Sequence, residues 1–170
     1  MKFIFITILL AHCFALPAQQ LDTANSWIEF TIIKMKDHEV NGTIRGMHGV
    51  IAFKDGDLDR IEICIKPGTV RTDQKLRDNN LKKEKYFDVA NHPSICFVSD
   101  SIVNSETGVL AYGQLQMLGI QQREMFTIRQ TATGLEGSTV INRMDYGLGG
   151  EPFFKIGEDV TIRVHCAFIP

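Results

Sequence analysis

Alternation of apolar and polar residues limits how this chain can fold more than any other feature. Ile28, Phe30 and Ile32 fall on one side of an extended segment, and Trp27 and Glu29 fall on the other. A period of two residues is typical of a strand with one buried face. The same alternation recurs along the chain in segments 40–45, 49–53, 61–65, 94–99, 109–117, 123–128, 137–142 and 160–168. Many short strands separated by turn residues predict an all-β sandwich or barrel.

The segment 72–88 interrupts this pattern. It is rich in charged and amide side chains, and its apolar residues follow no strand period. We expect one or two short helices here, capped by Thr72 or Asp73 and ended before Pro93.

The N-terminus predicts a secretory signal peptide over residues 1–18. Lys2 is followed by an apolar run and then by small residues that end at Ala18, which is the order of a cleavable signal. The run is shorter than the ~20 apolar residues that a membrane-spanning helix needs. A lipid anchor at Cys13 is disfavoured because His12 precedes it. We expect residues 19–170 to form a single exported domain, with no membrane-spanning segment.

Net charge and cysteine content further limit the partners and the disulfides that we expect. The formal net charge of −2 gives no attraction for nucleic acid, so a nucleic-acid partner is not expected. Cys64, Cys96 and Cys166 remain after the signal, and each lies within an apolar strand-like run. We expect them to behave as small buried hydrophobic residues, with one Cys64–Cys96 bridge as the alternative.

No pattern of catalytic or metal-ligating residues stands out. The histidines that follow the signal are far apart in sequence, and no Gly-x-Ser-x-Gly motif is present. The charged run 71–78 is typical of a solvated surface, and the glycine-rich run 146–150 is typical of a loop. We therefore predict no enzyme activity, no metal and no cofactor.

The apolar faces of so many strands point instead to the interior of a barrel. In a barrel of about eight strands, inward side chains either fill the interior or leave a cavity for a ligand. Such a cavity suits a greasy molecule, because burial contributes about 0.8 kcal/mol per CH₂ group.

Motifs along almost the whole exported part resemble the YceI-like family. The first is Ser26 to Phe30, followed by the strands around Gly42 and Val50. The most specific block reads Arg71-Thr72, Arg77-Asp78-x-x-Leu81, Tyr86-Phe87-Asp88 and His92-Pro93-Ser94-Ile95-Cys96-Phe97-Val98-Ser99. The later blocks are Gly113-Gln114-Leu115-Gln116-Met117-Leu118-Gly119 and Asn142-Arg143-Met144-Asp145-Tyr146-Gly147.

This resemblance implies an elongated, antiparallel, lipocalin-like β-barrel, periplasmic or secreted, that holds a long isoprenoid chain such as a quinone tail or a polyprenyl lipid. The inward residues that would line its bore are Ile28, Phe30, Ile51, Phe53, Ile63, Phe97, Leu115, Met117, Phe126 and Ile141. Arg77, Asp78 and Arg143 would order the helical segment or meet a polar head group at the mouth.

Three functions follow in order of preference. The first is a non-enzymatic carrier or store of an isoprenoid-like lipid in the bacterial periplasm, acting as a monomer or homodimer. The second is an envelope interaction or stress-protective module with a filled barrel. The third is an enzyme acting on a bound lipid, for which Arg77 and Asp78 would have to meet His92 beside the cavity.

Overall fold

The structure, a computed structural model, describes residues 18–34, 38–106, 108–149 and 156–170. The predicted signal peptide lies outside these residues apart from Ala18. The strands are β1 (Ala18–Gln19), β2 (Leu21–Lys34), β3 (His38–Ile44), β4 (His48–Lys54), β5 (Asp57–Ile65), β6 (Ile95–Ser105), β7 (Gly108–Met117), β8 (Ile120–Thr131), β9 (Gly134–Asn142) and β10 (Ile156–Phe168). The helical elements are the 3₁₀ turns η1 (Pro67–Thr69) and η2 (Arg143–Tyr146) and the α-helix α1 (Lys75–Leu81).

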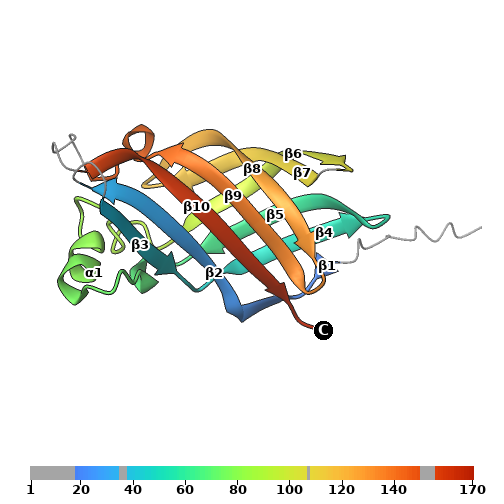
Figure 1. The fold of residues 1–170 in the computed structure, drawn as a ribbon, viewed down its shortest axis with the longest axis horizontal. Coiled ribbons are helices and arrows are strands. Elements are labelled where there is room, and N and C mark those ends of the chain that lie inside the picture. The colour runs from blue at the N-terminus through green and yellow to red at the C-terminus, as the bar shows by residue number, and fades with distance from the viewer. Residues whose placement is uncertain (1–17, 35–37, 107, 150–155) are drawn as a thin grey trace, which may run out of the picture.

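All strands belong to one antiparallel sheet that curls into a barrel (Figure 1). Their order is β1-β4-β5-β6-β7-β8-β9-β10-β2-β3. Only Gln20 separates β1 from β2, yet β1 pairs with β4 while β2 pairs with β10 and β3. β1 and β2 therefore form an almost continuous stretch of chain whose two parts lie at opposite ends of the strand order. This stretch closes one end of the barrel. This confirms the predicted lipocalin-like barrel, with ten strands in the described part of the chain where about eight were expected.

Tight turns connect several neighbouring strands. β4 and β5 are joined by Asp55 and Gly56, which have φ values of 55° and 93°. Leu118 and Gly119 join β7 and β8 with φ values of 54° and 77°. Two successive positive φ values define the hairpin turn whose twist matches that of the strands.

The long connection 66–94 leaves the sheet after β5 and attaches to the edge strand β3. Thr43 and Arg71 exchange backbone hydrogen bonds of 2.8 and 3.0 Å, and the amide of Lys66 donates to the carbonyl of Arg45 over 3.2 Å. α1, which this connection carries, lies at one end of the barrel (Figure 1). We call the connection 66–94 the mouth segment.

The helix is where the sequence predicted it, but its start differs from the prediction. The residue before the first turn is Gln74, which makes no capping hydrogen bond with its side chain. Thr72 does not cap α1, because its amide and hydroxyl both donate to Oδ1 of Asp78, over 2.8 and 2.5 Å. The carboxylate of Asp78, inside the helix, therefore holds Thr72, which lies before the helix. Thr72 does not cap the helix as predicted.

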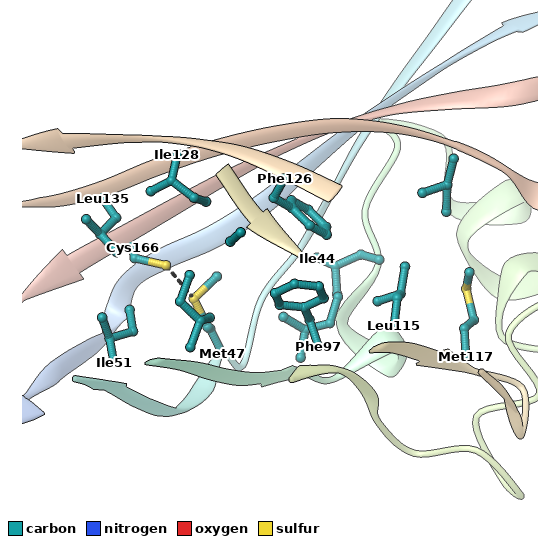
Figure 2. Close-up of a cluster of buried hydrophobic side chains, with 14 of the residues drawn as sticks. Ile44, Met47, Ile51, Phe97, Leu115, Met117, Phe126, Ile128, Leu135 and Cys166 are labelled. Atoms are coloured by element: carbon teal, nitrogen blue, oxygen red, sulfur yellow. Dashed lines mark hydrogen bonds between the residues drawn. The ribbon is translucent and has the colours of Figure 1, made fainter. Parts of the chain in front are cut away.

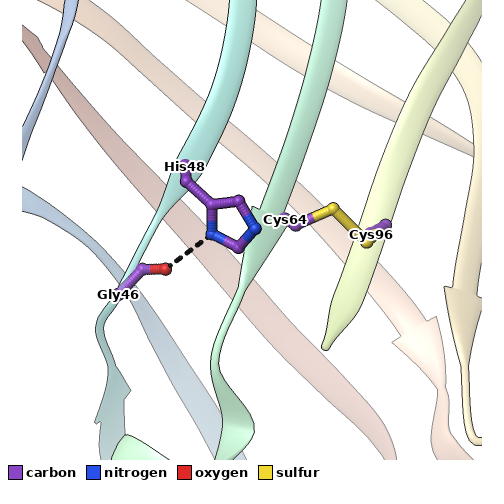
Figure 3. The surroundings of a disulfide bond; sticks show 4 residues. All are labelled: Gly46, His48, Cys64 and Cys96. Carbon is purple, nitrogen blue, oxygen red and sulfur yellow. Dashed lines mark hydrogen bonds between the residues drawn. A yellow bond between two sulfur atoms is a disulfide. The ribbon is translucent and has the colours of Figure 1, made fainter. Parts of the chain in front are cut away.

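Cys64 and Cys96 form a disulfide (Figure 3). The expectation that both are separate hydrophobic residues was wrong, and the alternative holds. The reason lies in the register, because Cys64 and Cys96 are directly opposite each other on β5 and β6. Their neighbours Ile63 and Ile65 line the interior, so the disulfide lies on the outer face of the sheet. Cys166 is free and buried, as expected.

Candidate ligand-binding cavity

A cavity of about 580 Å³ occupies the half of the barrel nearest α1. Side chains from β2, β3 and β5–β10 form its wall, and the mouth segment covers one end. The wall is almost entirely aliphatic and aromatic. Its apolar side chains are Ile28, Phe30, Ile32, Val40, Ile44, Ile61, Ile63, Ile65, Leu81, Phe87, Ile95, Phe97, Leu115, Met117, Phe126, Ile128, Leu135, Ile141, Leu148, Ile156, Val160, Ile162, Val164 and Cys166.

Most of the residues predicted to line the bore do face this cavity. They are Ile28, Phe30, Ile63, Phe97, Leu115, Met117, Phe126 and Ile141. Ile51 and Phe53 do not, which corrects their placement. They lie on β4 where it pairs with β1, so they pack into the closed end of the barrel. Ile51 is only 1% exposed, and the ring of Phe53 meets that of Phe168 edge-on at 6.0 Å.

Met47 and Cys166 form the floor of the cavity. Cys166 lines it, whereas Met47 lies behind with 1% exposure, and their sulfur atoms are 3.5 Å apart. Figure 2 shows this contact, with Ile51 beyond it and Leu115 and Met117 on the side of α1. Burial raises the pKa of the Cys166 thiol to about 12, so the floor is uncharged at neutral pH.

Phe97 and Phe126 pack against each other on the inner face of the sheet, from the two strands that flank β7. They come from β6 and β8, and their ring centroids are 4.8 Å apart (Figure 2). Both rings line the cavity.

Sequence reasoning missed the contribution of β10. Val160, Ile162 and Val164 line the cavity at alternate positions of this strand. The signal was present, because the segment 160–168 was predicted to be a strand and its period of two continues through these three residues.

The end of the cavity near α1 has a polar rim. Lys34, Gln74, Arg77, Asn80, Lys85 and Arg143 line it. Only Arg77 and Arg143 were predicted for the mouth. Asp78, predicted with them, is buried at 5% exposure but does not line the cavity. Its hydrogen bonds with Thr72 join two residues of the mouth segment, so Asp78 helps to order this segment.

Arg77 orders the mouth segment and also lines the cavity. Its Nε donates to Thr72 Oγ1 over 2.7 Å, and its Nη2 donates to the carbonyl of the same residue. Thr72 is thus held by Arg77 and Asp78 at once. These bonds fix the guanidinium of Arg77 at the rim.

Arg143 reaches the rim from η2, next to the buried ring of Tyr146. Its Nε donates to Gly157 O over 2.8 Å and its Nη1 to Leu148 O over 2.6 Å. Tyr146 is fully buried and donates its hydroxyl to Glu124 Oε1 over 2.7 Å. Burial and this carboxylate raise the pKa of Tyr146, so its hydroxyl stays protonated.

The structure does not bring together beside the cavity the residues that were considered for catalysis. Neither His92 nor Asp78 lines the cavity, and Nε2 of His92 lies 4.0 Å from a carboxylate oxygen of Asp88. Within the described residues, no group of three or more His, Cys, Asp or Glu side chains has the arrangement of a metal site. No helix in this part of the chain has the length and hydrophobicity to cross a membrane.

The family model of the YceI-like domain matches residues 19–168, the whole barrel and its mouth segment. The chain belongs to the YceI-like family. Curated relatives in this family include UPF0312 proteins of Staphylococcus aureus. The protein of strain MSSA476 is 26% identical over 165 residues, which cover 86% of this chain and 94% of the relative. That of strain MRSA252 is 25% identical over the same share of each chain.

Several solved structures share the fold. Burkholderia cenocepacia BcnA has a TM-score of 0.73 and 16% identity, covering 86% of this chain and 98% of its own. The YCEI protein of Campylobacter jejuni has a TM-score of 0.68 and 18% identity, covering 77% and 85%. A polyisoprenoid binding domain from Saccharophagus degradans has a TM-score of 0.66 and 15% identity, covering 92% and 100%. At these identities, the likeness establishes the architecture.

Proposed function

We propose that this YceI-like protein binds an isoprenoid-like lipid in its barrel and carries or stores it in the bacterial periplasm, without chemical conversion. The observation that carries the proposal is the cavity of about 580 Å³, whose wall is apolar from the floor to the rim. Pockets of this size enclose most of a small ligand, and an apolar wall favours an alkyl or isoprenoid chain.

Two further observations support the proposal. A protein with the same fold is described as a polyisoprenoid binding domain. The first residues read as an export signal, which fits a compartment where a lipid has to cross water between membranes. Binding by burial needs no metal and no covalent step.

The filled-barrel alternative is less well supported. Its distinguishing feature is a plugged bore with an exposed apolar patch. Within the described residues, the closed end around Met47, Ile51 and Leu58 is packed in this way, each being 1% exposed. The half of the barrel near α1 contains the cavity instead of packed side chains.

The proposal is tested by blocking the cavity. Ile162, on the wall, is changed to Trp, and Val140, which is 58% exposed on the neighbouring strand β9, is changed to Trp as the matched control. Each protein is exported with its own signal, purified without detergent, incubated with geranylgeraniol and examined by native mass spectrometry and organic extraction.

We expect bound lipid on the wild type and on Val140→Trp, and at least about tenfold less on Ile162→Trp, because an indole ring fills space that the chain needs. Circular dichroism has to show the same fold for all three proteins. Wild-type protein that stays free of lipid after incubation would overturn the proposal.

A further inference from the structure

The charged residues of the cavity wall are all of one sign. Lys34, Arg77, Lys85 and Arg143 are the charged members of the lining, and within the described part of the chain no Asp or Glu joins them. They come from the end of β2, from the mouth segment and from η2, and so converge on one end of the cavity from three separate parts of the sequence. The whole chain has a net charge of −2, so this positive rim is not a property of its average surface.

Arg143 is the most informative of the four. It is 5% exposed, and its guanidinium donates to the carbonyl oxygens of Gly157 and Leu148. Among the described residues, no carboxylate forms an ion pair with it. A guanidinium has five N–H donors in a planar fork, of which these two bonds use two. A buried cation held by dipoles alone gains most from an anion placed beside it.

Two carboxylates of the elements around the rim are engaged with other residues. Asp78 accepts two hydrogen bonds from Thr72, and Glu124 accepts the hydroxyl of Tyr146. Neither carboxylate lines the cavity. Among the described residues, Lys34, Arg77 and Arg143 therefore place positive charge at this end of the cavity, where no carboxylate lines it.

The cavity also sets the length of chain that it can enclose. A methylene group takes ~30 Å³, as a water molecule does in the liquid, so a volume of about 580 Å³ holds a chain of about 20 carbons. The floor at Met47 and Cys166 blocks a longer chain from extending into the closed end.

We infer that the ligand is a single-chain lipid with an anionic head group, a phosphate or a carboxylate, held at the rim by Arg143, Arg77 and Lys34, with about 20 carbons of its chain inside. This inference rests on the proposed function and names the class of lipid. The planar forks of the two arginines match the oxygen geometry of either head group, and Lys34 adds a point charge.

The test compares head groups on one chain. Geranylgeranyl monophosphate, geranylgeraniol and geranylgeranylamine share a 20-carbon chain, and oleate, oleyl alcohol and oleylamine form a second set with a carboxylate. Binding of each is measured by calorimetry below its micelle concentration, at low and at physiological salt. Inorganic phosphate is included to measure the head group alone.

Matched variants locate the effect. Lys34→Gln/Arg77→Gln removes two charges from the rim, and Lys54→Gln/Arg129→Gln removes two charges from exposed positions that do not line the cavity. Arg143→Lys keeps the charge but loses the fork, whereas Arg143→Gln loses both. Thermal unfolding of each variant shows whether the barrel is intact.

We expect the anion of at least one set to bind at least about tenfold tighter than the alcohol, with the amine weakest, and this preference to shrink as salt rises. The rim variant should lose most of the preference for the anion over the alcohol, and the control should keep it. Whether phosphate or carboxylate binds tighter then identifies the head group.

Equal binding of anion, alcohol and amine, or tightest binding of the amine, would overturn the anionic head group and leave the proposed function standing. A preference that survives equally in the rim variant would overturn the assigned residues. Failure of all six lipids to bind would overturn the proposed function itself.

Discussion

The sulfur atoms of Cys166 and Met47, 119 positions apart in sequence, lie 3.5 Å from each other and divide the barrel into an open and a filled half. Cys166 belongs to the wall of the cavity, and Met47 belongs to the packed side chains below it. The depth of the cavity is therefore set by one contact between β10 and the turn that precedes β4.

Shortening Met47 should deepen the cavity. Met47→Ala removes the side chain behind Cys166, and we expect the preferred chain to lengthen by several carbons, with a loss of about 2–4 kcal/mol in the free energy of unfolding. The check is the affinity for a series of alcohols of 16 to about 30 carbons, a range chosen to bracket the chain that fits the cavity.

Leu58→Ala is the matched control for this change. Leu58 is also 1% exposed in the closed end but does not line the cavity, so this variant should lose similar stability without a change in preferred chain length. The same length preference in wild type and Met47→Ala would contradict the role of Met47 as the floor.

The Cys166 thiol should be unreactive in the folded protein. Because burial raises its pKa to about 12, almost no thiolate forms at pH 8, and iodoacetamide should label it only after unfolding. Labelling is followed by mass spectrometry with and without urea. Fast labelling of the native protein at pH 8 would show that the floor is open to solvent.

The same pKa predicts an alkaline loss of stability. The folded state keeps the proton that the unfolded thiol releases, so this contribution is complete below about pH 8.5 and declines as the pH rises toward 12. Urea unfolding at several pH values should show a steeper alkaline decline for wild type than for Cys166→Ala. Parallel curves would mean that the thiol is solvated.

Removing the disulfide should destabilise the barrel but leave the cavity unchanged. Cys64 and Cys96 enclose a loop with a sequence separation of 32 that contains the whole mouth segment. Cys64→Ala/Cys96→Ala should lower the free energy of unfolding by about 3–4 kcal/mol, mainly because the unfolded chain gains freedom. Urea unfolding measures the loss, and lipid affinity is the internal control because the disulfide lies on the outer face. Unchanged stability would exclude a closed disulfide.

Asp78 should control the order of the mouth segment. Asp78→Ala leaves the buried amide and hydroxyl of Thr72 without their acceptor, and we expect a cost of about 1–3 kcal/mol. Hydrogen exchange should quicken in residues 72–81 while the amides of β7 and β8 keep their rates. Uniformly faster exchange through the barrel would contradict this local role.

Much of the barrel could be predicted from the sequence because its strands obey a strict alternation. That rule placed Phe97, Leu115 and Phe126 on the inner face, where they line the cavity. It failed for Ile51 and Phe53, since alternation says which face a side chain takes but not how far along the barrel axis it lies. The position of β1 against β4, which decides this, depends on pairing between distant segments.

The polar rim could be predicted only in part, for a similar reason. Arg77 and Arg143 belong to recognisable motifs, whereas Lys34 ends a strand and Lys85 lies in a charged run with no pattern of its own. Their convergence depends on the path of the mouth segment across the end of the barrel. The disulfide depends on the register between β5 and β6, which places Cys64 opposite Cys96. The spacing of the two cysteines in the sequence does not reveal this register.

The backbone exchange between Thr43 and Arg71 has a consequence for solubility. β3 is an edge strand, and an open edge offers unpaired amides and carbonyls to the strands of other molecules. The bridge to Arg71 occupies part of that edge with the mouth segment. Variants that loosen this segment to admit other lipids would therefore uncover a template for aggregation, so ligand selectivity and resistance to self-association are constrained by the same residues.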